Sequence, residues 1–294
     1  MSWTTFSILA ALIWSIVNIV DKYVLSKLVS RPIIPLIVLG FVGLITSIFV
    51  FVATGLQGLS SFNIFLALVA GVFYALMGFF YFQAVKVEEI SKVAPLFYLS
   101  PFFILVIAGL TLGEVFPPIK YLGILLLIIG AILISMKSLS SFTFGKAFWL
   151  MILSSLSLAF SQVLTKHLLN FADFWTVFAY IRVGAFLALV PAIYLNFSEL
   201  KAIYKESGAK VFGIMSFNES LNLVGVLFIT LAATTGFVTL VNALSSIQPF
   251  FVLFFTVLLS IFLPSILKEE ISKSTIFLKA TSIGMMFVGA LLVA

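Results

Sequence analysis

The sequence predicts an all-α integral membrane protein with ten transmembrane helices arranged as two inverted five-helix repeats. Three observations support this fold class: the high hydrophobic content, the length of the apolar runs and an internal repeat. Of the 294 residues, 63% are hydrophobic and 9% are charged, whereas about a quarter of the residues of soluble domains are charged. This composition, with a mean hydropathy of +1.30, excludes a soluble globular protein.

Ten apolar runs are long enough to cross a bilayer as helices, which requires roughly 17 to 25 mostly apolar residues. Charged residues or clusters of Gly, Ser and Asn bound these runs. A run such as Leu122 to Met136 is apolar on every side, which excludes the alternating pattern of a membrane β-barrel. The predicted helices cover residues 3–20, 32–53, 62–84, 91–112, 119–136, 147–168, 174–194, 210–232, 236–262 and 275–293.

The connections between the predicted helices are short, and the longest covers residues 195–209. They leave no room for a soluble catalytic or nucleic-acid-binding domain. Thirteen Lys and Arg residues lie in odd-numbered connections, two in even-numbered ones, and Arg182 lies inside a helix. Because cytoplasmic connections carry the excess of positive charge, we expect a multi-pass protein of the plasma membrane. Its odd-numbered connections would lie in the cytoplasm and both termini outside.

The two halves of the sequence resemble each other at offsets that increase along the chain. An offset of 144 residues pairs Asn18 with Gln162, and an offset of 148 pairs the Pro-Phe-Phe triplets 101–103 and 249–251. An offset of 159 pairs Lys120 with Lys279. Halves with an odd number of helices have opposite orientations in the membrane. We therefore predict a first repeat over residues 1–140 and an inverted second repeat over residues 141–294.

Short motifs occur in a characteristic order along the chain. They are Trp14-Ser15 to Lys22, Ala84 to Pro101 with its copy Ala232 to Pro249, and Leu112-Gly113-Glu114. With these motifs the whole chain resembles the EamA-like branch of the drug/metabolite transporter superfamily. The resemblance implies ten helices in two repeats and transport of small molecules.

Two features depart from that family pattern. The second-half counterpart of the Gly-Glu motif reads Lys268-Glu269-Glu270, without glycine. The family usually keeps both termini in the cytoplasm, whereas the charge count puts them outside. The orientation of the chain therefore stays open between the two arguments.

The composition excludes several chemistries. Cysteine is absent and His167 is the one histidine, so thiol catalysis and cysteine-ligated metal sites are excluded. The sequence contains neither a zinc-protease motif nor a phosphate-binding loop. We expect no enzymatic activity, no cofactor, no bound metal and no direct use of ATP.

A polar cluster inside the predicted helices is the main candidate for substrate binding. Arg182 lies about eight residues into helix 174–194 and Glu219 about nine residues into helix 210–232. At about 1.5 Å per residue their depths differ by roughly 5 Å, so the two side chains could pair. A charged residue at that depth marks a functional cavity by default, although an ion pair that only fixes helix register is the alternative. Asn218 and Asn222 flank Glu219 in this cluster.

Further polar residues inside predicted helices are candidates for the same cavity. Asn18 and Gln162 are repeat partners, as are Tyr74 and Asn222. Amide side chains could equally join helices by hydrogen bonds without binding a substrate. The remaining candidate substrate-binding residues are Tyr98, Asn242 and Ser246.

Pro101 and Pro249 occupy matching positions in the two repeats. Each lies inside a predicted helix, where proline removes a hydrogen bond and kinks the chain. We predict hinges at both prolines, although a kink that only serves packing would have the same sequence.

A secondary transporter that works by alternating access, in export or exchange, is the function that these observations favour. Its substrate is a small polar or amphipathic metabolite, and a cavity with both Arg182 and Glu219 favours an amino acid over a phosphorylated sugar. The alternative is a channel, or a structural or receptor-like multi-pass membrane protein. The expected partners are the substrate and the lipid bilayer, with no nucleic acid, and the chain is expected to be a monomer or a homodimer.

Overall fold

The computed structural model describes residues 2–29, 31, 33–55, 57–87, 96–135, 145–262 and 273–294, and every regular element within these ranges is a helix. The first part of the chain forms α1 (Trp3–Tyr23), a short π-helix (Val24–Leu28), α2 (Ile33–Thr54), α3 (Ser61–Val87), α5 (Ser100–Leu112) and α6 (Pro118–Ser135). The second part forms α7 (Lys146–Leu168), α8 (Phe174–Leu195), α9 (Phe197–Thr235), α10 (Val238–Ser245), α11 (Gln248–Phe262) and α12 (Lys273–Val293).

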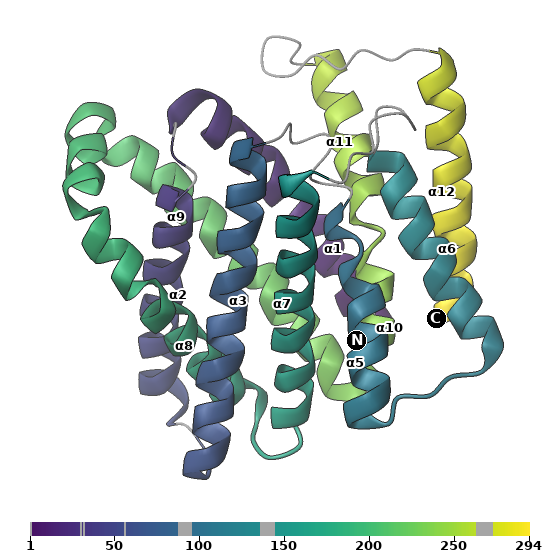
Figure 1. The fold of residues 1–294 in the computed structure, drawn as a ribbon, viewed down its shortest axis with the longest axis horizontal. Helices are drawn as coiled ribbons and strands as arrows, with labels where there is room; N and C mark the ends of the chain where they lie inside the picture. The colour runs from purple at the N-terminus through teal and green to yellow at the C-terminus, as the bar shows by residue number, and fades with distance from the viewer. Residues whose placement is uncertain are drawn as a thin grey trace.

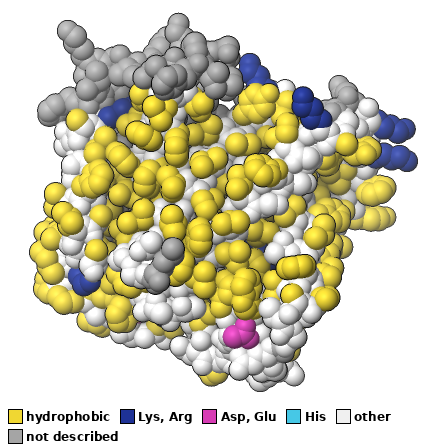
Figure 2. All heavy atoms as spheres, turned by 180° about the vertical axis from the view of Figure 1, so that it is seen from behind, with side chains coloured by type: hydrophobic (Ala, Val, Ile, Leu, Met, Phe, Trp, Pro, Cys, Tyr) yellow, Lys and Arg dark blue, Asp and Glu magenta, His cyan; other side chains and the backbone are white. Residues whose placement is uncertain are grey.

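Among the described residues, seven segments are long and apolar enough to cross a membrane, judged by length and composition. Three shorter apolar helices accompany them, at Ser100–Leu112, Pro118–Leu133 and Leu278–Val293. Hydrophobic side chains cover most of the face in Figure 2, and most of the Lys and Arg side chains visible there lie near its upper edge. The surface thus matches a multi-pass membrane protein.

Helices from the two parts of the chain pack against each other (Figure 1). α3 contacts α7 and α8, α1 contacts α9, and α6 contacts α12. The first and second parts therefore interlock and do not form two separate bundles. This arrangement brings polar residues of both parts to the middle of the molecule.

Glycines allow the closest of these contacts. A Cβ atom on Gly71 of α3 would collide with the backbone of Ile181 and Ala185 in α8, and one on Gly184 of α8 would collide with the backbone of Leu68 in α3. The two backbones touch here because small residues let helices approach closely in a membrane. α3 and α8 are thereby held as a tightly packed pair.

Two predicted boundaries differ from the structure. Residues 236–262 form two helices, α10 and α11, with a break at Ser246–Ile247. The predicted connection 195–209 is largely helical, because α9 begins at Phe197 and bends at Gly208, where φ is 70° and ψ is 179°. Hydropathy detects apolar length but not a break within an apolar run, or a polar helix outside it.

The proline predictions also need correction. Pro101 lies in the first turn of α5, and Pro249 is the second residue of α11. Proline is well tolerated in a first turn because its missing N–H has no partner there anyway. Neither proline kinks a continuous helix, so both mark the start of a new helix. Their role as hinges stays a prediction.

Charged side chains stabilise the junction between α9 and α10. Glu114, in the α5–α6 connection, is buried, and its carboxylate accepts hydrogen bonds from the backbone N–H groups of Val238 (2.8 Å) and Thr239 (3.0 Å) at the start of α10. Lys166 at the end of α7 donates to the carbonyl oxygens of Ala233 (2.6 Å) and Gly236 (2.9 Å) at the end of α9. Each charge complements the dipole of the helix end that it meets.

Candidate functional site

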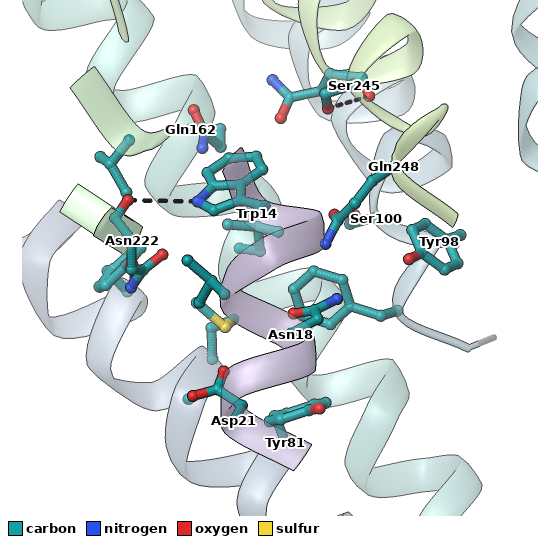
Figure 3. Close-up of a pocket in the computed structure, with 18 of the residues that line it drawn as sticks. Trp14, Asn18, Asp21, Tyr81, Tyr98, Ser100, Gln162, Asn222, Ser245 and Gln248 are labelled. Carbon is teal, nitrogen blue, oxygen red and sulfur yellow. Dashed lines mark hydrogen bonds between the residues drawn. The ribbon is translucent and has the colours of Figure 1, made fainter. Parts of the chain in front are cut away.

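The largest cavity has a volume of about 180 Å³ and lies between helices from both parts of the chain (Figure 3). α1, α2, α3, α5, α7, α9 and α10 contribute to its wall. The sequence-predicted residues that line it are Asn18, Tyr74, Tyr98, Pro101, Gln162, Glu219, Asn222, Asn242 and Ser246. The structure thus brings most of the candidate residues to one place.

One side of α1 forms a polar wall of the cavity. Trp14, Asn18 and Asp21 follow one another along this helix at spacings of four and three residues (Figure 3), which puts them on one face. The indole N–H of Trp14 donates to the backbone carbonyl of Asn222 (3.4 Å). A Cβ atom on Gly225 would collide with the Trp14 ring. The indole therefore connects α1 to α9 at the cavity wall.

α9 contributes a second polar wall, which contains Glu219. The side-chain amide of Asn222 donates to the Glu219 carboxylate (3.1 Å) and also reaches the Tyr74 hydroxyl (3.4 Å). Asn218 is buried behind this wall and donates to the carboxylate of Asp21 (2.7 Å). Asn218 does not line the cavity. It orients Asp21, which does.

The predicted pairing of Arg182 with Glu219 is wrong. Among the described residues the one ion pair is Arg31 with Glu199, at 2.6 Å on the surface. Arg182 instead lies over the ring of Tyr74, with its guanidinium carbon 4.0 Å from the ring centre. It lines a separate small cavity and not the large one. The depth argument was insufficient because depth does not determine which way a side chain points.

α10 and the residues after it form the third polar wall. Asn242 donates to the Val238 carbonyl (2.9 Å), and the hydroxyls of Ser245 (2.8 Å) and Ser246 (3.2 Å) donate to the Asn242 carbonyl. These hydroxyls therefore present acceptor oxygens to a ligand. Pro249 lies just beyond this wall and does not line the cavity.

The sequence analysis missed several lining residues. Asp21 served there only as the boundary of the first helix, although α1 continues to Tyr23 and buries this carboxylate among α1, α3 and α9. A signal existed, because Asp21 follows Asn18 by three residues on the same helical face. Trp14, Tyr81, Ser100 and Gln248 also line the cavity and carried no signal that distinguished them from interface or packing residues.

The charge of the cavity wall is negative. Asp21 and Glu219 are the charged side chains among its described lining residues, and neither Lys nor Arg is among them. Aromatic rings of Trp14, Tyr74 and Tyr81 stand in the same wall. Two carboxylates at the edge of a small aromatic-lined cavity suit a ligand with a positively charged group.

Comparisons with known proteins add the family. Residues 1–136 match the model of the EamA-like transporter family. No curated protein sequence matches the chain.

Twenty-nine chains of solved structures match the chain. One is a crystal structure titled only as that of a protein; it is 18% identical, with a TM-score of 0.65, and the match covers 99% of this chain and 96% of that one. At this identity the likeness shows a shared fold and nothing about the ligand. The family match over residues 1–136 supports a membrane transporter and places this protein in the drug/metabolite transporter superfamily, through the EamA-like transporter family.

Proposed function

We propose that this protein is a secondary transporter that moves an amino acid or a related small amine across the plasma membrane by alternating access, in export or exchange. The observation that carries the proposal is the central cavity, which combines residues from both parts of the chain with two carboxylates. Members of the matched family are generally not enzymes. We accordingly assign these carboxylates to binding and not to catalysis.

The substrate class follows from the charge of the cavity wall. A substrate ammonium group would interact with Asp21 and Glu219, and the rings of Trp14 and Tyr74 would add cation–π attraction. The sequence analysis expected a zwitterion held by both Glu219 and Arg182. Since Arg182 lines a neighbouring cavity, we now assign recognition to the ammonium end. A phosphorylated sugar would need cations, which the described lining residues lack.

Binding and transport with a matched pair of variants test this proposal. Thermal-shift measurements of the purified protein against amino acids, amines, nucleobases and sugar phosphates would first identify a ligand. Glu219→Gln should abolish the shift and the counterflow of that ligand in liposomes. The control is Glu199→Gln, which removes a carboxylate outside the cavity and should leave both unchanged.

Different outcomes would contradict different parts of the proposal. A ligand whose shift survives Glu219→Gln would bind elsewhere. A phosphate ligand would overturn the substrate class. Flux that does not saturate with concentration would favour the alternative, a channel, over a transporter.

For the architecture, we propose ten transmembrane helices in two inverted halves, in a protein that is a monomer or a homodimer. The internal sequence repeat and the interlocked packing of the two parts support this arrangement. Alternating access would then follow from motion of one half relative to the other.

The charge count supports a cytoplasmic location for the odd-numbered connections. The chain contains no cysteine, so a single introduced cysteine can be labelled without background. Ser60→Cys and Lys201→Cys lie at exposed positions of an even-numbered and an odd-numbered connection. A membrane-impermeant thiol reagent should label the first in intact cells and the second only after lysis. The reverse result would support the orientation that is usual in the family.

A further inference from the structure

The guanidinium of Arg182 is buried in the middle of α8 without a hydrogen-bonded partner for two of its nitrogens. Arg182 is 3% exposed, and its Nε and Nη1 atoms have no acceptor among the described residues. Its contacts are the faces of Tyr74 and Phe178, whose ring centres lie 4.0 and 5.6 Å from the guanidinium carbon. Gly43 of α2 leaves space for its aliphatic stem.

Such a charge requires a counterion. Moving an isolated ion from water into a protein interior is costly, and more so within a membrane. Aromatic faces offset only part of this cost. Glu219 influences Arg182 through space but forms no ion pair with it. The guanidinium is therefore left with an attractive field and free N–H donors.

A small cavity adjoins these donors. It has a volume of about 10 Å³ and is lined by polar groups of α7, α8 and α9, namely Ser161, Gln162, Thr165, Arg182 and Thr230. A cavity of roughly 10 to 15 Å³ holds a single particle of the size of a water molecule. The hydroxyls of Thr165 and Thr230 already donate to carbonyl groups of their own helices, which leaves Arg182 as the main donor.

We propose that this cavity binds one halide ion, chloride in the cell, as the counterion of Arg182. A water molecule would fit the space but would leave the charge uncompensated. A carboxylate group has three heavy atoms, more than a cavity of this size accepts. The site requires no transport activity, so it can exist whether or not the proposed function is correct.

Unfolding at constant ionic strength tests the site directly. The purified protein is kept in gluconate buffer, and gluconate is replaced stepwise by chloride, bromide or iodide. The melting temperature should rise and saturate with halide concentration. Arg182→Lys should weaken the apparent halide affinity by about tenfold or more, as expected when a charge-assisted hydrogen bond is lost.

Arg182→Met sharpens the test because it removes the charge altogether. The halide response should disappear, and in gluconate this variant should melt no lower than the wild type, since an uncompensated charge is gone. Arg31→Gln is the matched control: it removes an arginine whose side chain is 64% exposed and should keep the full halide response.

Several results would overturn the proposal. They are a melting temperature that ignores halide at fixed ionic strength, a response that persists in Arg182→Met, or stabilisation by acetate or glycine where halides have no effect. The last would assign Arg182 to a carboxylate. If Arg182→Met does not fold, a wild-type structure determined in bromide decides: an anomalous peak beside Arg182 supports the site, and an empty cavity rejects it.

Discussion

The junction between α9 and α10 and the central cavity both bury charged side chains, but they use them differently. At the junction, Glu114 and Lys166 each make two hydrogen bonds to backbone groups at helix ends. In the cavity, Asp21 and Glu219 each accept one hydrogen bond from an asparagine side chain. Beside it, two nitrogens of Arg182 have no partner within the described chain.

This difference separates structural from functional charges. A buried charge whose hydrogen-bonding capacity is used by fixed backbone groups holds those groups in place. A buried charge with spare capacity is costly for the apo protein and available to a ligand. Depth in the membrane alone would not distinguish Glu114 from Glu219.

The largest effect is expected at the junction. Glu114→Ala removes two hydrogen bonds to a carboxylate, each worth about 1.5–3 kcal/mol, so the free energy of unfolding should fall by roughly 3–5 kcal/mol. Denaturant unfolding in detergent measures it. Glu199→Ala is the control, because its carboxylate lies in a surface ion pair. A loss below about 1 kcal/mol, the size of one ordinary hydrogen bond, would refute the structural role of Glu114.

In the cavity the same loss of a carboxylate should affect binding more than stability. Asp21→Asn keeps the shape of the side chain and removes a charge that is costly to bury. The affinity for the identified amine should fall about tenfold, equal to about 1.4 kcal/mol, while the melting temperature stays level or rises. Isothermal titration and thermal unfolding of the same sample measure both. A stability loss as large as that of Glu114→Ala would remove the distinction between the two regions.

A third charge caps a helix at the molecular surface. Asp173 accepts hydrogen bonds from the N–H groups of Trp175 (2.9 Å) and Thr176 (3.1 Å) at the start of α8. Partial burial acts to raise its pKa, but these bonds outweigh burial and hold the pKa below the ordinary value of 3.8. Asp173→Ala should cost about 1 kcal/mol, as is typical of lost N-caps.

The pH dependence of this cap has a definite sign. Because the folded-state pKa of Asp173 is depressed, its stabilisation is present above pH 3.8 and is lost as the pH falls through the folded-state value. Thermal unfolding from pH 5 downward should therefore show the wild type and Asp173→Ala converging. A constant difference between them would contradict the cap.

The smallest effect is expected for the surface ion pair. Arg31→Gln breaks the contact with Glu199, but the arginine side chain is 64% exposed. Exposed pairs contribute about 0–1 kcal/mol and are screened by salt. Its unfolding midpoint should match that of the wild type within error at high ionic strength. A larger loss would mean that exposure is a poor guide to the value of a charge in this protein.

The sequence predicted the helices better than the directions of their side chains. Apolar length gave the starts of α1 and α8 at Trp3 and Phe174, because hydropathy is a local property. It also marked Asn18 and Glu219, since polar residues inside apolar runs are conspicuous. It failed for Arg182, because the rotation of α8 about its axis depends on packing against α2 and α3, which no local pattern encodes.

The role of Glu114 shows a second limit of sequence reasoning. Its motif was noticed, but its partners lie 124 and 125 residues further along the chain. The sequence around Val238 and Thr239 is apolar or neutral and contains no sign of a buried carboxylate. Only the folded arrangement, with α5 beside α10, reveals the contact.

The contact of Gly71 with Gly184 has a consequence for motion. Because each glycine meets the other helix's backbone, α3 cannot slide along α8 by a helical turn without driving larger neighbouring side chains into that backbone. A rotation about this point keeps the two surfaces together, whereas a translation separates them. If the two halves of the molecule move relative to each other, the Gly71–Gly184 contact is therefore where a pivot would cost least.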